Sequence, residues 1–64
     1  MKDIEYGSGI IRVTKSEFKG NTYIDIRKYY LDKDTDEYKP TKKGISIPEN
    51  LVEEVLKSLK EVSS

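Results

Sequence analysis

The sequence predicts an α+β domain in which three or four antiparallel strands precede one helix. β-Branched and aromatic residues are concentrated between Ile10 and Ile47, where polar or glycine-containing turns divide them into short runs. A helical spacing of apolar residues follows Pro48. Strands joined by short turns pair antiparallel, so we expect an antiparallel sheet with the helix at its C-terminal end.

Length and composition limit how such a domain can be stabilised. The chain has 64 residues, no cysteine and no histidine. A domain of this size buries only about 60% of its unfolded surface, so its core alone is marginally stable. Disulfides and the usual zinc ligands are unavailable, so we expect no metal site and no cofactor. Association with a second copy remains as the stabiliser, and the sequence therefore predicts a homodimer.

The chain contains no apolar run of about 18 residues and no signal-peptide core after Met1. We therefore expect a soluble, intracellular protein with no membrane partner. In a prokaryote it would lie in the nucleoid or cytoplasm, and in a eukaryote in the nucleus.

The first two predicted strands follow a glycine-containing N-terminus. Residues 1–9 are interpreted as a flexible lead-in, and residues 10–64 as the domain. The run IIRVTK, residues 10–15, predicts the first strand. A turn at FKGN, with its glycine and asparagine as turn residues, separates it from the strand TYIDIRKYYL, residues 22–31, which the polar turn DKDTDE ends.

The segment YKPTKKGISI predicts one or two further strands. Pro40 has no N–H to donate to a neighbouring strand, so it must lie at an edge or a kink. Gly44 marks a turn or a bulge. Pro48 then opens the helix, and Glu49 has the charge that the first turn favours.

The predicted helix has a wide apolar stripe. At 100° per residue, six apolar side chains fall within an arc of about 140°: Leu51, Val52, Val55, Leu56, Leu59 and Val62. One side of a small sheet usually covers less than this, so we expect the helix to pack on its own sheet and against a partner's helix. The dimer interface is predicted at Leu51, Val55, Leu59 and Val62.

The sequence does not favour catalysis or calcium binding. Asp32, Asp34 and Asp36 have the spacing of a calcium loop, but Glu37 and Lys43 occupy the positions that need glycine and glutamate. An acidic, solvated turn is the better interpretation. Serines and threonines are present without any histidine base, so we name no catalytic residue and expect a protein that is not an enzyme.

The charges are segregated although they sum to zero. Residues 10–30 and 38–47 together carry eight basic and two acidic residues, and the rest of the chain is acidic. Such a basic stretch suits an anionic partner.

The segment FKGNTYIDIRKYY, residues 18–30, combines rings and cations on one strand. Alternation places Arg27 and Tyr29 on one side, and Lys28 and Tyr30 on the side of the isoleucines, pointing inward unless a bulge re-aims them. Aromatic faces stack on unpaired bases while lysine and arginine contact phosphates, so the segment suits a single-stranded nucleic acid. Composition alone gives equal weight to tyrosines that merely cover a small core.

Three motifs at consistent spacing resemble the transcriptional positive-cofactor-four family, whose members are single-stranded-DNA-binding coactivators. The resemblance covers about residues 10–60. The motifs are Phe18-Lys19-Gly20, Ile24-Asp25-Ile26-Arg27 and Lys39-Pro40-Thr41-Lys42-Lys43-Gly44-Ile45-Ser46.

The resemblance implies a homodimer whose subunits each have a curved four-stranded antiparallel sheet and one helix, ββββα. It implies sequence-independent binding of single-stranded DNA in transcription regulation, or in replication or repair. The family's roles would fall to Phe18 and Tyr30 as stacking platforms, and to Lys19, Arg27, Lys39 and Lys43 as phosphate contacts. Charge segregation adds Arg12, Lys15 and Lys42 to the phosphate contacts.

The sequence departs from the family pattern in ways that bear on function. Tyr30 replaces a tryptophan of better-known members, and SIPEN lacks the usual capping side chain before the helix. The sequence has no Ser-rich, acidic regulatory region like that of animal coactivators, so DNA binding is expected more than activator bridging. The alternatives are a protein-interaction module that tethers polymerase or other transcription machinery, and an RNA-binding chaperone.

Overall fold

The computed structural model describes residues 1–64 as one four-stranded antiparallel sheet followed by a helix. The strands follow one another in the sheet in the order of the sequence, β1-β2-β3-β4, which confirms the ββββα architecture. The elements are β1 (Lys2–Tyr6), β2 (Gly9–Phe18), β3 (Asn21–Asp32), β4 (Glu37–Pro48), the 3₁₀ turn η1 (Glu49–Leu51) and α1 (Val52–Ser63).

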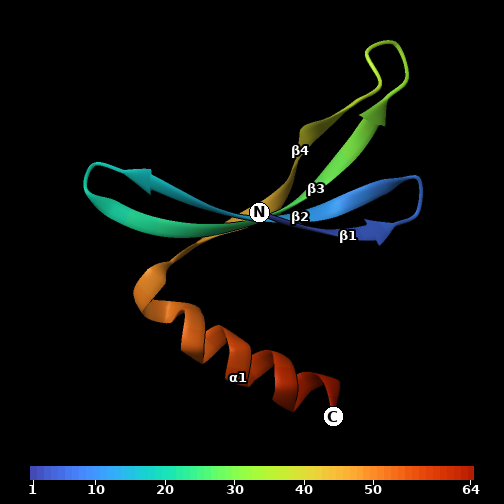
Figure 1. The fold of residues 1–64 in the computed structure, drawn as a ribbon. Helices are drawn as coiled ribbons and strands as arrows, with labels where there is room; N and C mark the ends of the chain where they lie inside the picture. Colours follow the sequence, from blue (N-terminus) through green and yellow to red (C-terminus); the bar gives the residue numbers. More distant parts are fainter.

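The sheet is strongly twisted, and its three hairpins extend in different directions (Figure 1). The β2–β3 hairpin extends to one side, whereas the β1–β2 and β3–β4 hairpins extend to the other and splay apart. Helix α1 lies under one face of the sheet. We call this the helix face; it carries Val13, Ile24, Ile26 and Ile47. The opposite side, which carries Arg12, Phe18, Arg27 and Tyr29, is the open face.

Strand β1 differs from the expectation of a flexible lead-in at residues 1–9. Lys2–Tyr6 pairs with β2 over its whole length, and Tyr6 lies opposite Gly9. Gly7 has φ +60, a left-handed conformation that glycine adopts without steric cost. Gly7 and Ser8 therefore form a two-residue hairpin turn, so the expectation of a flexible segment here is wrong.

The turn between β2 and β3 confirms a predicted turn but shifts it by one residue. Its central residues are Lys19 and Gly20, with φ 52 and 79, and Asn21 already pairs with Phe18 as the first residue of β3. Two positive φ angles in a two-residue loop identify a type I′ turn, whose twist matches that of the flanking strands.

The segment YKPTKKGISI lies within one continuous strand, β4, at the edge of the sheet. The predicted edge position of Pro40 is therefore confirmed. Gly44 does not turn the chain: between the pairs Arg27↔Gly44 and Tyr29↔Pro40, three residues of β4 oppose one of β3. A Cβ on Gly44 would come within 2.8 Å of the Arg27 side chain, so the glycine allows Arg27 to cross β4 beside this bulge.

The helix starts where the sequence predicts, although its first turn is 3₁₀. Pro48 precedes η1, and α1 follows from Val52 without a side-chain cap, as the missing capping residue led us to expect. No helix has the length and apolar character needed to cross a membrane.

The sheet and helix enclose very little. Only Ile10 and Ile47 are buried, at 3% and 7% exposure. A cavity of about 250 Å³ separates helix from sheet, and apolar side chains alone line it: Val13, Ile24, Ile26, Ile47, Val52, Val55, Leu56 and Leu59. The helix stands off its own sheet, so one protomer by itself has almost no packed core.

Candidate nucleic-acid interface

An exposed aromatic ring and a cation meet at the tip of the β2–β3 hairpin. Phe18 is 63% exposed, and the Lys19 Nζ lies 5.3 Å from the centroid of its ring. The type I′ turn places the two residues side by side at the end of β2. The exposure of Phe18 does not fit a ring that covers a core.

Arg12 lies in the middle of the open face, between a carboxylate and a ring. Its Nε donates to Asp3 Oδ1 at 2.8 Å, and its Nη2 donates to Oδ2 at 3.1 Å. Its guanidinium carbon lies 4.7 Å from the centroid of the Tyr29 ring. The hydrogen bond from Arg12 lowers the pKa of Asp3, and the same bond raises the pKa of Arg12. Asp3 belongs to β1, a strand that the sequence did not predict, so this pairing was not expected.

Arg27 binds both its own strand and β4. Its Nε and Nη2 each donate to Asp25 at 3.2 Å, and its Nη1 donates to the carbonyl oxygen of Thr41 at 3.0 Å. Ser46 Oγ donates to the same carboxylate at 3.0 Å. The hydrogen bond from Arg27 is the main cause that lowers the pKa of Asp25, and it raises the pKa of Arg27 in return. This guanidinium therefore joins β3 to the bulge.

The bulge of β4 presents two lysines to solvent. Thr41 Oγ1 donates to the carbonyl oxygen of Lys28 at 2.7 Å and accepts from the backbone N–H of Lys43 at 3.2 Å. Lys42 and Lys43 are exposed and have no carboxylate within ion-pair distance. The sequence did not indicate Thr41 as a supporting residue, because the bulge that it stabilises depends on how β3 and β4 pair.

Tyr30 lies on the helix face but outside the area that the helix covers. The bulge is in β4, so β3 keeps its regular alternation and Tyr30 stays on the side of Ile24 and Ile26. It is nevertheless 48% exposed. Phe18 is on the open face, so one protomer offers two separate rings and not one continuous stacking platform.

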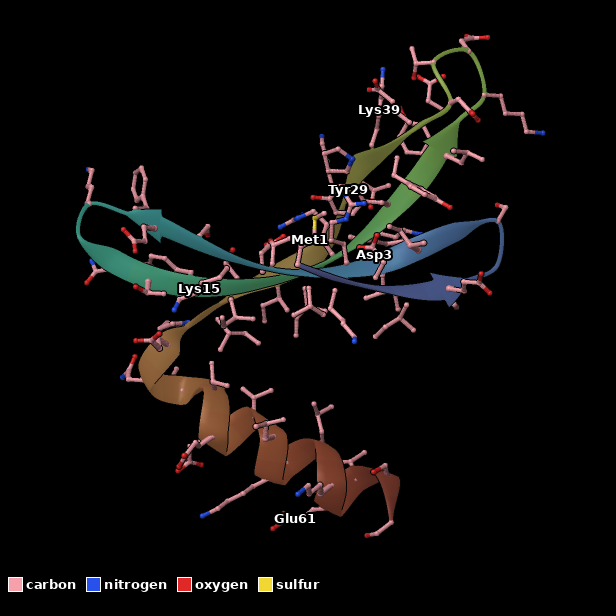
Figure 2. The ribbon with its side chains drawn as sticks, in the orientation of Figure 1. Met1, Asp3, Lys15, Tyr29, Lys39 and Glu61 are labelled. Carbon is pink, nitrogen blue, oxygen red and sulfur yellow. The ribbon has the colours of Figure 1, made fainter.

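Two further predicted cations, Lys15 and Lys39, form ion pairs. The Lys15 Nζ lies 3.7 Å from Glu49, and the Lys39 Nζ lies 3.0 Å from Asp32. The hydrogen bond from Lys39 is the main cause that lowers the pKa of Asp32. Figure 2 shows Lys15 and Lys39 on hairpins that extend in opposite directions. The structure thus distributes the predicted phosphate contacts over the molecule, and Lys19, Lys42 and Lys43 are those without a carboxylate partner.

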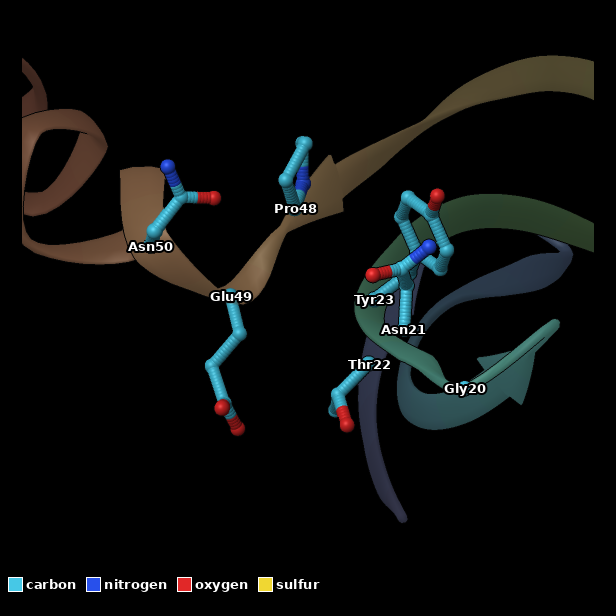
Figure 3. Close-up of a pocket in the computed structure, with 7 residues that line it drawn as sticks. All are labelled: Gly20, Asn21, Thr22, Tyr23, Pro48, Glu49 and Asn50. Carbon is cyan, nitrogen blue, oxygen red and sulfur yellow. The ribbon is translucent and has the colours of Figure 1, made fainter.

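A polar hollow of about 450 Å³ lies beside the Lys19–Gly20 turn, between the start of β3 and η1 (Figure 3). The side chains of Thr22 and Glu49 lie across the gap from each other. Glu49 is the only charged group that lines it, and it pairs with Lys15. A single acidic group is unfavourable for phosphate, so this hollow adds no anion site to the interface.

The predicted dimer residues gather on the outer side of α1. Leu51, Val55, Leu59 and Val62 line a hollow of about 330 Å³ together with Glu54 and Ser58. Val55 and Leu59 also line the cavity between helix and sheet. The apolar stripe therefore has one side toward the sheet and one side toward solvent, as its predicted width requires.

A family model, two relatives and several solved structures match this chain. The model of the family "Transcriptional Coactivator p15 (PC4)" matches residues 7–58. The chain belongs to the PC4 family. This confirms the resemblance carried by the three motifs of β2, β3 and β4.

Two curated relatives of this PC4-family chain are described as coactivators. The RNA polymerase II transcriptional coactivator SUB1 of Saccharomyces cerevisiae is 56% identical over 46 residues, which are 72% of this chain and 16% of the relative. A putative RNA polymerase II transcriptional coactivator of Caenorhabditis elegans is 50% identical over 34 residues, 53% of this chain and 27% of the relative. The chain thus spans only a small part of either relative.

Solved structures of PC4 homologs share the fold. A PC4 homolog from Burkholderia pseudomallei superposes with a TM-score of 0.89 at 30% identity, covering 98% of this chain and 85% of that one. A bacteriophage T5 homolog of the eukaryotic coactivator PC4, implicated in recombination-dependent DNA replication, has a TM-score of 0.58 at 30% identity. It is matched over 98% of this chain and 96% of its own.

Proposed function

We propose that this PC4-family chain binds single-stranded DNA as a homodimer, largely without regard to sequence. The observation that carries the proposal is the exposed Phe18 ring with Lys19 beside it at the end of the β2–β3 hairpin. A ring stacks on the face of any unpaired base, and an adjacent ammonium contacts the phosphate, so the pair suits a single strand of any sequence. Tyr30 supplies a second ring on the helix face.

The cations support the proposal in two groups. Lys19, Lys42 and Lys43 have no carboxylate partner in the protomer and are free for phosphates. Arg12, Lys15, Arg27 and Lys39 form ion pairs with acidic side chains. Solvent screens the more exposed pairs of Lys15 and Lys39, so a phosphate can replace the carboxylate there, whereas the two-donor pairs of Arg12 and Arg27 hold these cations in place.

The homodimer is supported by the apolar side chains that helix α1 leaves exposed in one protomer. Leu59 and Val62 are 56% and 86% exposed on the outer side of α1, and a small domain seldom leaves such a stripe in water. A second helix in the hollow along Leu51, Val55, Leu59 and Val62 would press α1 toward its sheet and complete the core. We therefore infer that another copy of this chain covers this stripe.

The biological setting rests on the relatives. Two of them are described as RNA polymerase II transcriptional coactivators, and one phage homolog as implicated in recombination-dependent DNA replication. We propose transcription as the process, with the transcription machinery as a further partner, and replication or repair as the alternative. In either case the proposed place of action is the compartment that contains the DNA, a nucleoid or a nucleus.

The test combines a ring deletion with a salt titration. Phe18→Ala should weaken binding of a single-stranded oligonucleotide by about 1 to 3 kcal/mol and change duplex binding much less. Tyr38→Ala is the matched control, because Tyr38 is an exposed ring of β4 outside the proposed contacts. In the natural protein, the slope of log K against log[salt] should be near −0.7 for each phosphate contact.

The same measurement separates the proposal from the alternatives. If folded Phe18→Ala binds single strands as the natural protein does, the ring does not contact DNA and a protein-interaction module is the better function. If the protein binds an RNA strand much more tightly than a DNA strand of the same sequence, an RNA-binding chaperone is the better function.

A further inference from the structure

Beyond Tyr29, strands β2 and β3 separate, and the β1–β2 and β3–β4 hairpins diverge from a common fork (Figure 1). Gly9 forms the floor of this fork. A Cβ at Gly9 would overlap the carbonyl oxygen of Tyr29, so only glycine lets the two strands meet this closely. The fork opens into a hollow of about 400 Å³. Its lining residues are Tyr6, Gly7, Ser8, Gly9, Lys28, Tyr29 and Tyr30.

Two exposed rings and a cation face this hollow from different strands. Tyr6 pairs with Gly9 on β1, and Tyr6 and Tyr30 are 53% and 48% exposed. The Lys28 Nζ lies 5.0 Å from the centroid of the Tyr6 ring. Lys28 and Tyr30 are two residues apart on β3 and therefore share a face.

The lining has the chemistry of a nucleotide site. Its polar groups are hydroxyls, backbone groups and one ammonium, and no carboxylate lines it. Lys28 has no ion-pair partner, so its charge is available to an anion. A ligand that is flat and anionic satisfies the rings and the ammonium together, whereas an apolar helix or peptide leaves Lys28 without a partner.

We propose that Tyr6 and Lys28 complete the stacking position already assigned to Tyr30, so that the fork takes one unpaired nucleobase against Tyr6 and Tyr30 and its phosphate against Lys28. The proposal rests on the proposed single-strand binding, and it adds Tyr6, which neither the motifs nor the charge pattern indicated, and a phosphate contact for Lys28. The fork and Phe18 lie at opposite ends of the β2–β3 pairing and on opposite faces of the twisted sheet, so a strand that contacts both follows the length of the sheet and passes from one face to the other.

The test is a pair of substitutions at Tyr6, with an oligothymidylate long enough to span the protein as the probe. Tyr6→Leu keeps apolar bulk on β1 but has no aromatic face, and Tyr6→Phe keeps the face. We expect Tyr6→Leu to weaken binding by about 5- to 150-fold, the factor that corresponds to one stacked base, and Tyr6→Phe to bind nearly as the natural protein. Lys28→Gln should reduce the salt slope by about 0.7, the contribution of one phosphate.

The controls keep this proposal separate from the function on which it rests. If Phe18→Ala weakens binding while Tyr6→Leu binds the oligonucleotide as tightly as Tyr6→Phe and the natural protein do, the fork proposal alone is overturned. If the natural protein does not bind the oligonucleotide, the proposed function fails and the fork proposal fails with it. If Tyr6→Leu does not fold, photocrosslinking of a 5-iodouracil oligonucleotide to the natural protein decides: a crosslink at Tyr6 supports the fork, and crosslinks confined to Phe18 and Tyr30 overturn it.

Discussion

At Asp3, Asp25 and Asp32, a cation from a neighbouring position or strand holds each carboxylate in its charged form. Arg12, Arg27 and Lys39 provide these hydrogen bonds, and each lowers the pKa of its partner. Three of the cations predicted to contact phosphate therefore also stabilise the fold. The pairs of Asp3 and Asp32 join β1 to β2 and β3 to β4, so they tie the outer strands to the centre of the sheet, whereas the Asp25–Arg27 pair lies within β3.

These pairs predict acid sensitivity. A carboxyl whose pKa is lower in the folded state than in the unfolded state stabilises the fold above its unfolded pKa, near 4, and loses this contribution as the pH falls through its folded pKa. We expect the melting temperature to fall below about pH 4 and to change little between pH 5 and 8, because the chain has no histidine.

Asp25→Asn tests the assignment to a residue. This variant should melt at a lower temperature at pH 7 and should lose less on acidification than the natural protein. Glu61→Gln, on the far side of the helix (Figure 2), is the control and should leave both values unchanged. Thermal melts from pH 2 to 8 measure both, and an identical acid dependence in Asp25→Asn would contradict the role of this pair.

Among the elements, strand β4 owes its shape to its contacts with β3. Its bulge is held by Arg27 from β3 and by the hydrogen bonds of Thr41, and Gly44 leaves the space that the guanidinium side chain crosses. Lys42 and Lys43 project from this bulge. Arg27 is thus a positioning residue for two lysines as well as a cation in its own right.

Arg27→Lys should reveal this positioning role. Lysine keeps the charge but cannot donate to Asp25 and Thr41 at once in the fixed geometry of a guanidinium. We expect a lower melting temperature and weaker single-strand binding, with a salt slope close to that of the natural protein because the number of cations is unchanged. Lys33→Arg, in the exposed turn after β3, is the matched control. A variant with natural stability and natural affinity would show that the bulge does not depend on Arg27.

The whole molecule has very little interior for a domain of its length. Ile10 and Ile47 are its only buried residues, and helix α1 has apolar side chains on both its sheet side and its outer side. A second copy would remove the outer side from water and supply the packing that 64 residues cannot supply alone.

Leu59→Asp is the sharpest test of the dimer, because Leu59 lines both the outer hollow and the cavity beneath the helix. An unpaired carboxylate there should cost several kcal/mol and convert a dimer at micromolar concentration into an unstable monomer. Lys57→Asp changes the exposed, charged side of the same helix and should leave the dimer intact. Sedimentation measures the oligomeric state of both variants, and thermal melts measure their stability. A stable folded monomer of the natural sequence would contradict the proposed homodimer.

The sequence by itself determined the features that depend on neighbouring residues. A turn within FKGN, the two central strands, the edge position of Pro40 and the helix after Pro48 are all local consequences of backbone and side-chain chemistry, and the structure contains each of them, with the turn shifted by one residue. The three motifs likewise identified the family, because motif spacing is a property of the chain itself.

Only the tertiary structure decided what depends on register between distant residues. It made a strand of residues 2–6, put the bulge in β4 so that Tyr30 stays on the side of the isoleucines, and paired Arg12 with a carboxylate nine positions away. It also brought Tyr6 beside Lys28. A shift of one residue in strand pairing moves every side chain to the other face, and nothing in a short stretch of sequence specifies that shift. Which rings and cations share a surface was therefore decided by pairing across the sheet.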